Sequence, residues 1–196
     1  MQDQHRFNTK AWLLWTAGFV AFIIGGALAT GVVGRINDLG SALIGGMIAG
    51  AVIGTGQWLV ARRLLDAQTW IPATALAMGI GLAVGAWAVG YGTSLGELAL
   101  MGFITGIPLG AAQAYLLRDR VANAWVWAAA LPLLWALGWT VTTAGGIDVD
   151  QQFAVFGAYG AITFMALSGV LLDRLRAATT PSTPALDPGP TKVMAQ

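Results

Sequence analysis

Residues 46–62 read GMIAGAVIGTGQWLVAR, and residues 102–118 read GFITGIPLGAAQAYLLR. In both stretches three glycines stand four residues apart, a glutamine follows three residues later, and an arginine follows after five more. The five matching pairs all lie 56 residues apart: Gly46 and Gly102, Gly50 and Gly106, Gly54 and Gly110, Gln57 and Gln113, Arg62 and Arg118. Five matches at one offset indicate an internal repeat. Since residues i, i+4 and i+8 share one helix face, each stretch predicts a helix with a glycine stripe.

The rest of the chain is equally apolar. Of its 196 residues 57% are apolar and only 10% are charged, whereas soluble domains carry about a quarter charged residues. The uncharged runs are 11–34, 39–61, 67–96, 98–117, 121–147 and 151–172. Each is long enough to cross roughly 30 Å of hydrocarbon as a helix, the structure that satisfies its own backbone hydrogen bonds in lipid. The composition therefore argues against a soluble globular domain.

We predict an all-α, polytopic membrane protein. Its six transmembrane helices are expected at about 11–33, 39–61, 70–92, 96–117, 122–144 and 151–172. The sixth is a degraded copy of the second and fourth, with Gly157, Ala161, Ser168 and Arg174 near the equivalent places. The transmembrane domain, 11–173, is thus expected to contain three two-helix hairpin repeats, at about 11–63, 70–120 and 122–176. Residues 1–10 form a cytoplasmic stub, and the proline-rich stretch 177–196 is predicted to be a disordered cytoplasmic tail.

The lysines and arginines predict the orientation. Nine of the ten fall at the N-terminus, in the second and fourth connections, or after the last span, and only Arg35 falls elsewhere. By the positive-inside rule both termini should be cytoplasmic. One alternative is that the first span is a cleaved signal peptide, because Ala27-Leu28-Ala29 imitates a cleavage site. Its apolar run is long for a signal core, and cleavage would break the repeat, so we predict that the span is retained.

Residues 54–63, GTGQWLVARR, together with the Trp-led apolar helix that follows, resemble a family of uncharacterised bacterial Gly-rich multispan membrane proteins with GxxQWLVxRR-type repeats. The resemblance implies a bacterial multi-pass membrane protein, and we expect it in the inner membrane. The family carries no assigned activity, cofactor or site residue, so the resemblance says nothing about mechanism.

Three sets of residues are candidates for function. The glycine stripes predict tight helix packing, with a thin-walled pore or a lipid groove as the alternative. Gln57 and Gln113 are expected just inside the cytoplasmic interface, either bonded between helices or acting as a symmetry-related pair of polar ligands. Trp135 and Trp139 share a helix face and either fill the bundle or stack on a lipid tail or pigment. Six other tryptophans are expected to anchor the cytoplasmic interface: Trp12, Trp15, Trp58, Trp70, Trp125 and Trp127.

Acidic residues precede the three even-numbered spans. Asp38 stands before the second span, Ser94 and Glu97 form a capping box at the fourth, and Asp148 and Asp150 stand before the sixth. Carboxylates at these places accept the free backbone N–H groups of a helix start. We therefore expect helix caps and no metal site, although an acidic rim that binds metal is the alternative.

What the sequence lacks excludes several classes of function. It has no cysteine, its one histidine is His5, and no predicted span carries a charge near its middle. Ion-coupled transporters and proton pumps normally need such a charge, and a nucleophile–base pair cannot be assembled. A net charge of +1 provides no field for nucleic acid. We expect neither an enzyme nor a resident cofactor, with a bound lipid or pigment left open.

The sequence favours a non-catalytic accessory, scaffold or assembly subunit of a membrane complex or homo-oligomer. Its expected partners are membrane lipids and either another membrane protein or further copies of itself. The alternative is a channel or carrier for a small neutral solute. That function would need a polar path from Gln57, Gln113 and Thr55 or Thr105 to the outer face.

Overall fold

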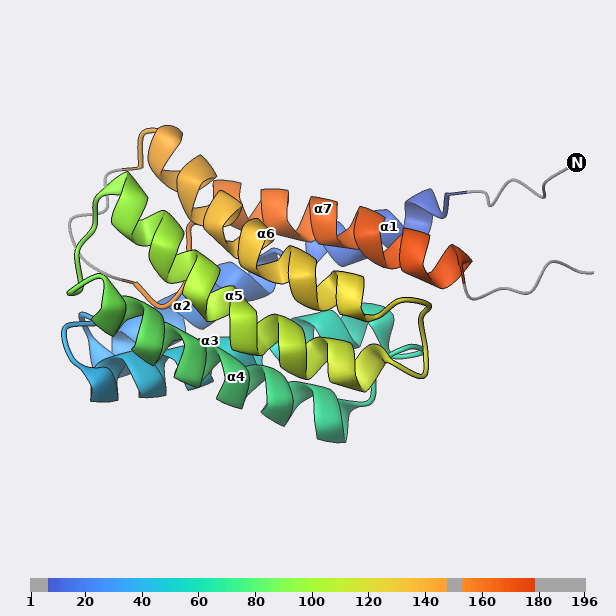
Figure 1. Cartoon of the computed structure of the whole chain (residues 1–196), viewed down its shortest axis with the longest axis horizontal. Coiled ribbons are helices and arrows are strands. Elements are labelled where there is room, and N and C mark those ends of the chain that lie inside the picture. The colour runs from blue at the N-terminus through green and yellow to red at the C-terminus, as the bar shows by residue number, and fades with distance from the viewer. Residues whose placement is uncertain (1–6, 148–152, 179–196) are drawn as a thin grey trace, which may run out of the picture.

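The computed structural model describes residues 7–147 and 153–178, and every regular element in these ranges is an α-helix. The helices are α1 (Thr9–Ala17), α2 (Val20–Val33), α3 (Leu39–Ala61), α4 (Ala67–Ala88), α5 (Leu95–Leu117), α6 (Trp125–Ala144) and α7 (Ala158–Ala177). They lie side by side along one axis of the molecule (Figure 1).

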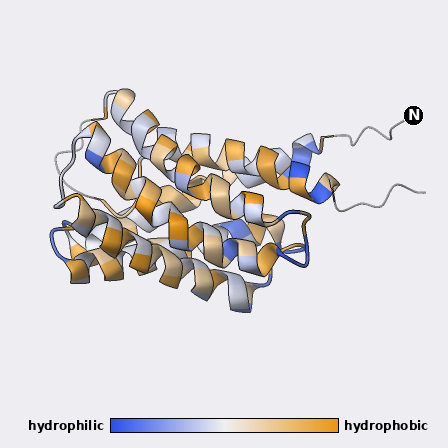
Figure 2. Cartoon of the chain, viewed as in Figure 1, coloured by the Kyte–Doolittle hydropathy of each residue, from blue (hydrophilic) through white to orange (hydrophobic). Residues whose placement is uncertain are grey.

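Six helical segments among the described residues are long and apolar enough to cross a membrane, with α1 and α2 together forming the first. Hydrophilic residues gather at the two ends of the bundle, and hydrophobic and neutral ones cover its length (Figure 2). The protein is therefore an all-α polytopic membrane protein with six spans. The predicted tail lies almost wholly outside the described residues, which end at Ala178, just after α7.

The first span is interrupted near Gly18. The Gly18 N–H donates to the Trp15 carbonyl (2.9 Å) and the Phe19 N–H to the Thr16 carbonyl (3.0 Å), so the last turn of α1 tightens before α2 begins. A Cβ placed on Gly18 would lie 2.7 Å from Cε of Met165 in α7. A side chain at this position would therefore displace the end of the Met165 side chain.

The spans form a closed ring in chain order. Each packs against its neighbours in the sequence, and α7 closes the ring by packing against both α1 and α2. The two spans of each predicted hairpin therefore pack against each other. Neighbouring spans from different hairpins also pack together, namely α3 with α4 and α5 with α6. The division of the chain into units at 11–63, 70–120 and 122–176 stays a prediction.

Two of the predicted helix caps are present. The Asp38 side chain accepts from the Ser41 N–H (2.9 Å), and this bond holds the pKa of Asp38 below its usual value. Ser94 and Glu97 form the expected capping box of α5, in which the Ser94 N–H donates to Glu97 Oε2 (2.8 Å). Both connections therefore lead into their helices with satisfied backbone donors.

The expected start and cap of the sixth span are wrong. This helix, α7, begins at Ala158 and not near residue 151, and its N-cap is Gly157, with no side-chain cap. Asp148 and Asp150 lie outside the described residues, well before this start. The chain from Phe153 to Gly157 is not helical, because Ala154, Val155 and Phe156 enter the core there. A run of apolar residues looks the same in sequence whether it forms a span or fills a core.

Candidate functional site

Gln57 and Gln113 meet in the bundle interior. They lie in the last turns of α3 and α5, and both side chains are almost completely buried. Nε2 of Gln113 donates to Oε1 of Gln57 (3.2 Å) and also lies 3.1 Å from Oγ1 of Thr74 in α4. Two residues related by the sequence repeat are therefore direct hydrogen-bond partners.

Tryptophans supply the remaining bonds of this cluster. Nε1 of Trp70 donates to Oε1 of Gln57 (3.1 Å), and Nε1 of Trp127 donates to Oε1 of Gln113 (3.1 Å). We call the five residues Gln57, Trp70, Thr74, Gln113 and Trp127 the glutamine cluster. It joins α3, α4, α5 and α6 at the end of the bundle that carries Arg62 and Arg118.

A third hydrogen bond between a tryptophan and a buried polar residue follows the same pattern. Nε1 of Trp15 in α1 donates to Oγ of Ser168 in α7 (3.0 Å), and both residues are buried. The Trp15 ring meets the Trp127 ring edge-on, with centroids 6.2 Å apart. Gln57 in α3, Gln113 in α5 and Ser168 in α7 thus each accept a hydrogen bond from a tryptophan of the next span around the ring.

The role expected for three tryptophans was wrong. Trp15, Trp70 and Trp127 are only 4%, 1% and 0% exposed, so their rings lie in the interior and do not anchor the interface. Trp125, by contrast, is exposed, as an anchor should be. The sequence contains a signal for these hydrogen bonds, because Trp70 follows Gln57 by 13 residues and Trp127 follows Gln113 by 14.

The polar groups that would extend this cluster point back to their own helices. The Thr55 hydroxyl donates to the Ala51 carbonyl (2.8 Å), and the Thr105 hydroxyl donates to the Met101 carbonyl (2.8 Å). Such bonds satisfy a hydroxyl within a helix. Neither threonine therefore continues the polar path that a solute would need.

The glycine stripes lie where neighbouring backbones come closest. A Cβ on Gly46 would lie 2.8 Å from Cα of Gly79, and one on Gly50 would lie 2.8 Å from the Thr74 carbonyl oxygen. Gly54 faces Thr74 and Ile71 of the same helix, α4. At Gly46 and Gly50 no side chain larger than hydrogen fits without moving α4, and at Gly54 the nearest contact of an added Cβ is 3.1 Å, to Cβ of Thr74.

The second stripe has the same relation to α6. A Cβ on Gly102 would lie 2.8 Å from the Trp135 carbonyl oxygen, and one on Gly110 would lie 2.8 Å from that of Ala128. On Gly106 it would lie 2.5 Å from Cα of Pro132. Both stripes thus pack on the span that follows in the chain.

Trp135 and Trp139 lie within an aromatic cluster that fills the core beyond the glutamine cluster. Trp135 contacts Phe156 (centroids 4.9 Å apart), Phe164 (5.7 Å) and Phe22 (6.1 Å), and Trp139 meets Phe156 edge-on (5.9 Å). All five side chains are buried. The Trp135 and Trp139 rings thus pack against the protein's own phenyl rings.

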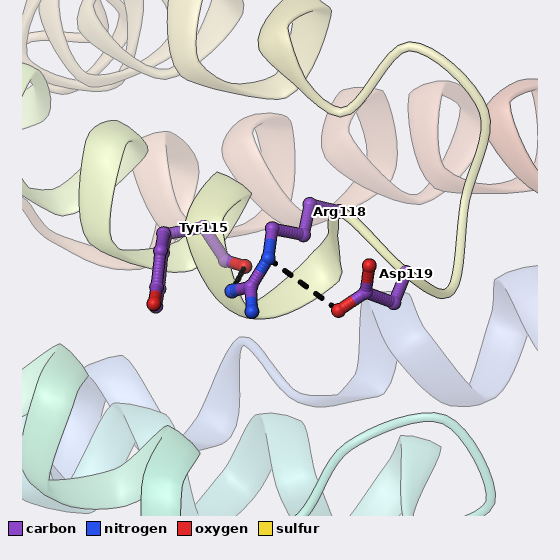
Figure 3. Close-up of polar contacts among 3 residues, drawn as sticks. All are labelled: Tyr115, Arg118 and Asp119. Atoms are coloured by element: carbon purple, nitrogen blue, oxygen red, sulfur yellow. Dashed lines mark hydrogen bonds and ion pairs between the residues drawn. The ribbon is translucent and has the colours of Figure 1, made fainter.

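The arginine that ends the second repeat stretch is held locally. The Arg118 guanidinium lies 3.9 Å from the Tyr115 ring centroid, donates to the Tyr115 carbonyl (2.7 Å) and pairs with Asp119 (3.4 Å), as Figure 3 shows in part. Nearby, Nη1 of Arg120 donates to the Leu64 carbonyl, which ties the α5–α6 connection to the α3–α4 connection. Arg118 thus bonds only within its own turn, whereas Arg120 bonds to another connection.

Across residues 7–147 and 153–178, no group of three or more His, Cys, Asp or Glu side chains is placed to hold a metal ion. Comparison of the chain with protein-family models, curated proteins and solved structures finds no match.

Proposed function

We propose that this chain is a non-catalytic integral membrane protein that acts by packing, as an accessory, scaffold or assembly subunit of a membrane complex or of a homo-oligomer. The observation that carries the proposal is the glutamine cluster. Its amide and indole groups bond to one another across four helices. Polar groups that hold helices together in this way are typical of a structural core in lipid.

The interior also favours this role over transport. Beyond the glutamine cluster the core contains the aromatic cluster of Phe22, Trp135, Trp139, Phe156 and Phe164, all buried. A neutral solute needs polar partners along its whole path, and this half of the interior offers large apolar rings. The alternative of a channel or carrier would require these rings to move apart.

The buried polar residues support a non-catalytic role. Within the described ranges they are Gln57, Thr74, Thr105, Gln113, Thr142 and Ser168. None of these side chains is a general acid or base near neutral pH, and a serine or threonine nucleophile needs such a base beside it. We further propose a bacterial inner-membrane location with both termini in the cytoplasm, a proposal that rests on the distribution of lysine and arginine.

Reconstitution into liposomes tests the transport alternative. We expect no flux of water, glycerol or small ions above that of empty vesicles. Flux that disappears in a Gln57→Leu, Gln113→Leu double variant of unchanged thermal stability would replace our proposal with a pore.

Photo-crosslinking in cells tests the proposal directly. A photoreactive residue at lipid-facing positions such as Leu76, Leu100 or Leu133, which are half exposed or more, should capture a neighbouring protein from one face of the ring. The same residue at the buried Leu131 serves as the control and should give no intermolecular product. A chain that gives no intermolecular product at any position and purifies as a monomer without a stoichiometric partner contradicts the scaffold role.

A further inference from the structure

A groove opens at the arginine-rich end of the bundle, between α1, the end of α3 and α7. Its volume is about 630 Å³, within the range of roughly 300–1,000 Å³ of small-molecule sites. The residues that define it here are Lys10, Trp12, Arg62, Arg63, Asp173 and Arg176. We call it the basic groove, and it is separate from the glutamine cluster.

Positive charge dominates the basic groove. Four of its residues are cationic and one, Asp173, is acidic. The cations come from three places in the chain: Lys10 from α1, Arg62 and Arg63 from the end of α3, and Arg176 from α7. None of the four forms an ion pair with a described residue, in contrast to Arg118, which is paired with Asp119. Folding thus concentrates like charges that an anion would stabilise.

The wall of the basic groove is apolar where it meets the bundle. Nε1 of Trp12 donates to the Ala166 carbonyl of α7 (2.9 Å), so the ring is fixed across the gap between α1 and α7. Leu14 and Leu59 also line the groove, and both are about half exposed on the outside of the bundle. The site therefore combines a cationic end with an apolar side open to the bilayer.

Its depth matches the headgroup region. The α3 helix ends at Ala61, and Arg62 and Arg63 follow at once. Arg176 lies in the last turn of α7, and Lys10 lies in the first turn of α1. Charged side chains at the ends of spans lie at the level of lipid headgroups, and basic pockets between spans suit anionic ones.

We propose that the basic groove binds one anionic phospholipid, with its phosphate among Arg62, Arg63, Arg176 and Lys10 and its acyl chains along Leu14 and Leu59. Guanidinium groups bind phosphate oxygens through paired N–H donors, which favours a phosphate-bearing headgroup. The excess of cations selects a headgroup with net negative charge over a zwitterionic one. A soluble phosphate would use only the cationic end and would gain nothing from the exposed leucines.

Native mass spectrometry of the delipidated full-length protein in detergent tests this proposal. The probes are phosphatidylglycerol and phosphatidylcholine with the same acyl chains. We expect a single phosphatidylglycerol to remain bound in preference to phosphatidylcholine. The Arg63→Gln, Arg176→Gln double variant should lose roughly tenfold in phosphatidylglycerol affinity, since each interfacial cation contributes measurably to anionic-lipid binding.

The matched control removes two cations from the same end outside the groove, as Arg118→Gln with Arg174→Gln. It should retain the selectivity if the groove, and not general surface charge, binds the lipid. Equal loss in both double variants, or equal binding of the two lipids by the wild type, would overturn the proposal. Thermal unfolding of each variant establishes that the bundle is intact.

Two further experiments establish whether the bound anion is a lipid or a soluble phosphate compound, and where it binds. Excess glycerol 3-phosphate should not displace phosphatidylglycerol, and displacement would assign the groove to a soluble phosphate compound instead. A phosphatidylglycerol with a photoreactive acyl chain should label peptides from α1 and from the end of α3, which carry Leu14 and Leu59. Labelling confined to other spans would place the lipid elsewhere and refute the site.

Discussion

Gln113 donates a hydrogen bond to Gln57 across 3.2 Å, and the two residues are 56 positions apart, the same offset that relates the two repeat stretches. Equivalent residues of a repeat thus become direct partners. Oε1 of Gln57 accepts hydrogen bonds from both Nε1 of Trp70 and Nε2 of Gln113, so position 57 must supply an acceptor. The pair therefore ties the two repeat stretches together at one end of the bundle.

Replacing Gln113 by leucine should destabilise the bundle. The change leaves Nε1 of the buried Trp127 without its acceptor, and a buried donor without a partner costs about 1–3 kcal/mol. We expect a lower Tm in detergent for Gln113→Leu and for Gln57→Leu. Gln68→Leu, at an exposed position of α4, is the control. Unchanged melting of both cluster variants would mean that these bonds contribute nothing to stability.

Adding a methyl group to a stripe glycine should separate two helices. In Gly106→Ala the new Cβ would lie 2.5 Å from Cα of Pro132, so α5 and α6 must move apart at a cost of about 1–3 kcal/mol. Gly50→Ala should behave similarly against α4. Gly31→Ala is the matched control, because nothing lies within 4 Å of its Cβ position. If all three variants melt alike, close approach at the stripes is not what holds the spans.

Phe156→Ala should be among the most damaging single changes. The ring is buried and contacts Phe22, Trp135, Trp139 and Phe164, and truncating a core phenylalanine typically costs about 3–5 kcal/mol. Thermal unfolding in detergent measures the effect. Leu133→Ala, on the exposed side of α6, should change the Tm far less. A small effect at Phe156 would show that the segment before α7 is not part of the stable core.

Single cysteines test the orientation, since the chain has none of its own. Asn37→Cys and Gly96→Cys are exposed at one end and should react with an impermeant thiol reagent added to intact cells. Gln68→Cys and Ala178→Cys, exposed at the other end, should react only after the membrane is opened. The reverse pattern would place both termini outside.

Several features could be predicted from single stretches of sequence because their causes are local. The uncharged run that begins at residue 39 became α3 with the expected bounds, Leu39–Ala61, since a long apolar segment in lipid must bond its own backbone. Asp38 and Ser94 cap their helices because a cap needs only the residues of one turn. Phe156 could not be predicted, because its place depends on rings from three other segments.

The sequence by itself determined that there are six spans, the caps of α3 and α5, and the faces that carry glycine or glutamine. Only the tertiary structure decided that the stripes pack on α4 and α6, that Trp15 bonds to Ser168, and that cations from three segments share the basic groove. The physical reason is that lipid is as apolar as the protein interior. Hydropathy therefore does not distinguish an inward face from an outward one, and partners are selected by close packing and hydrogen bonds.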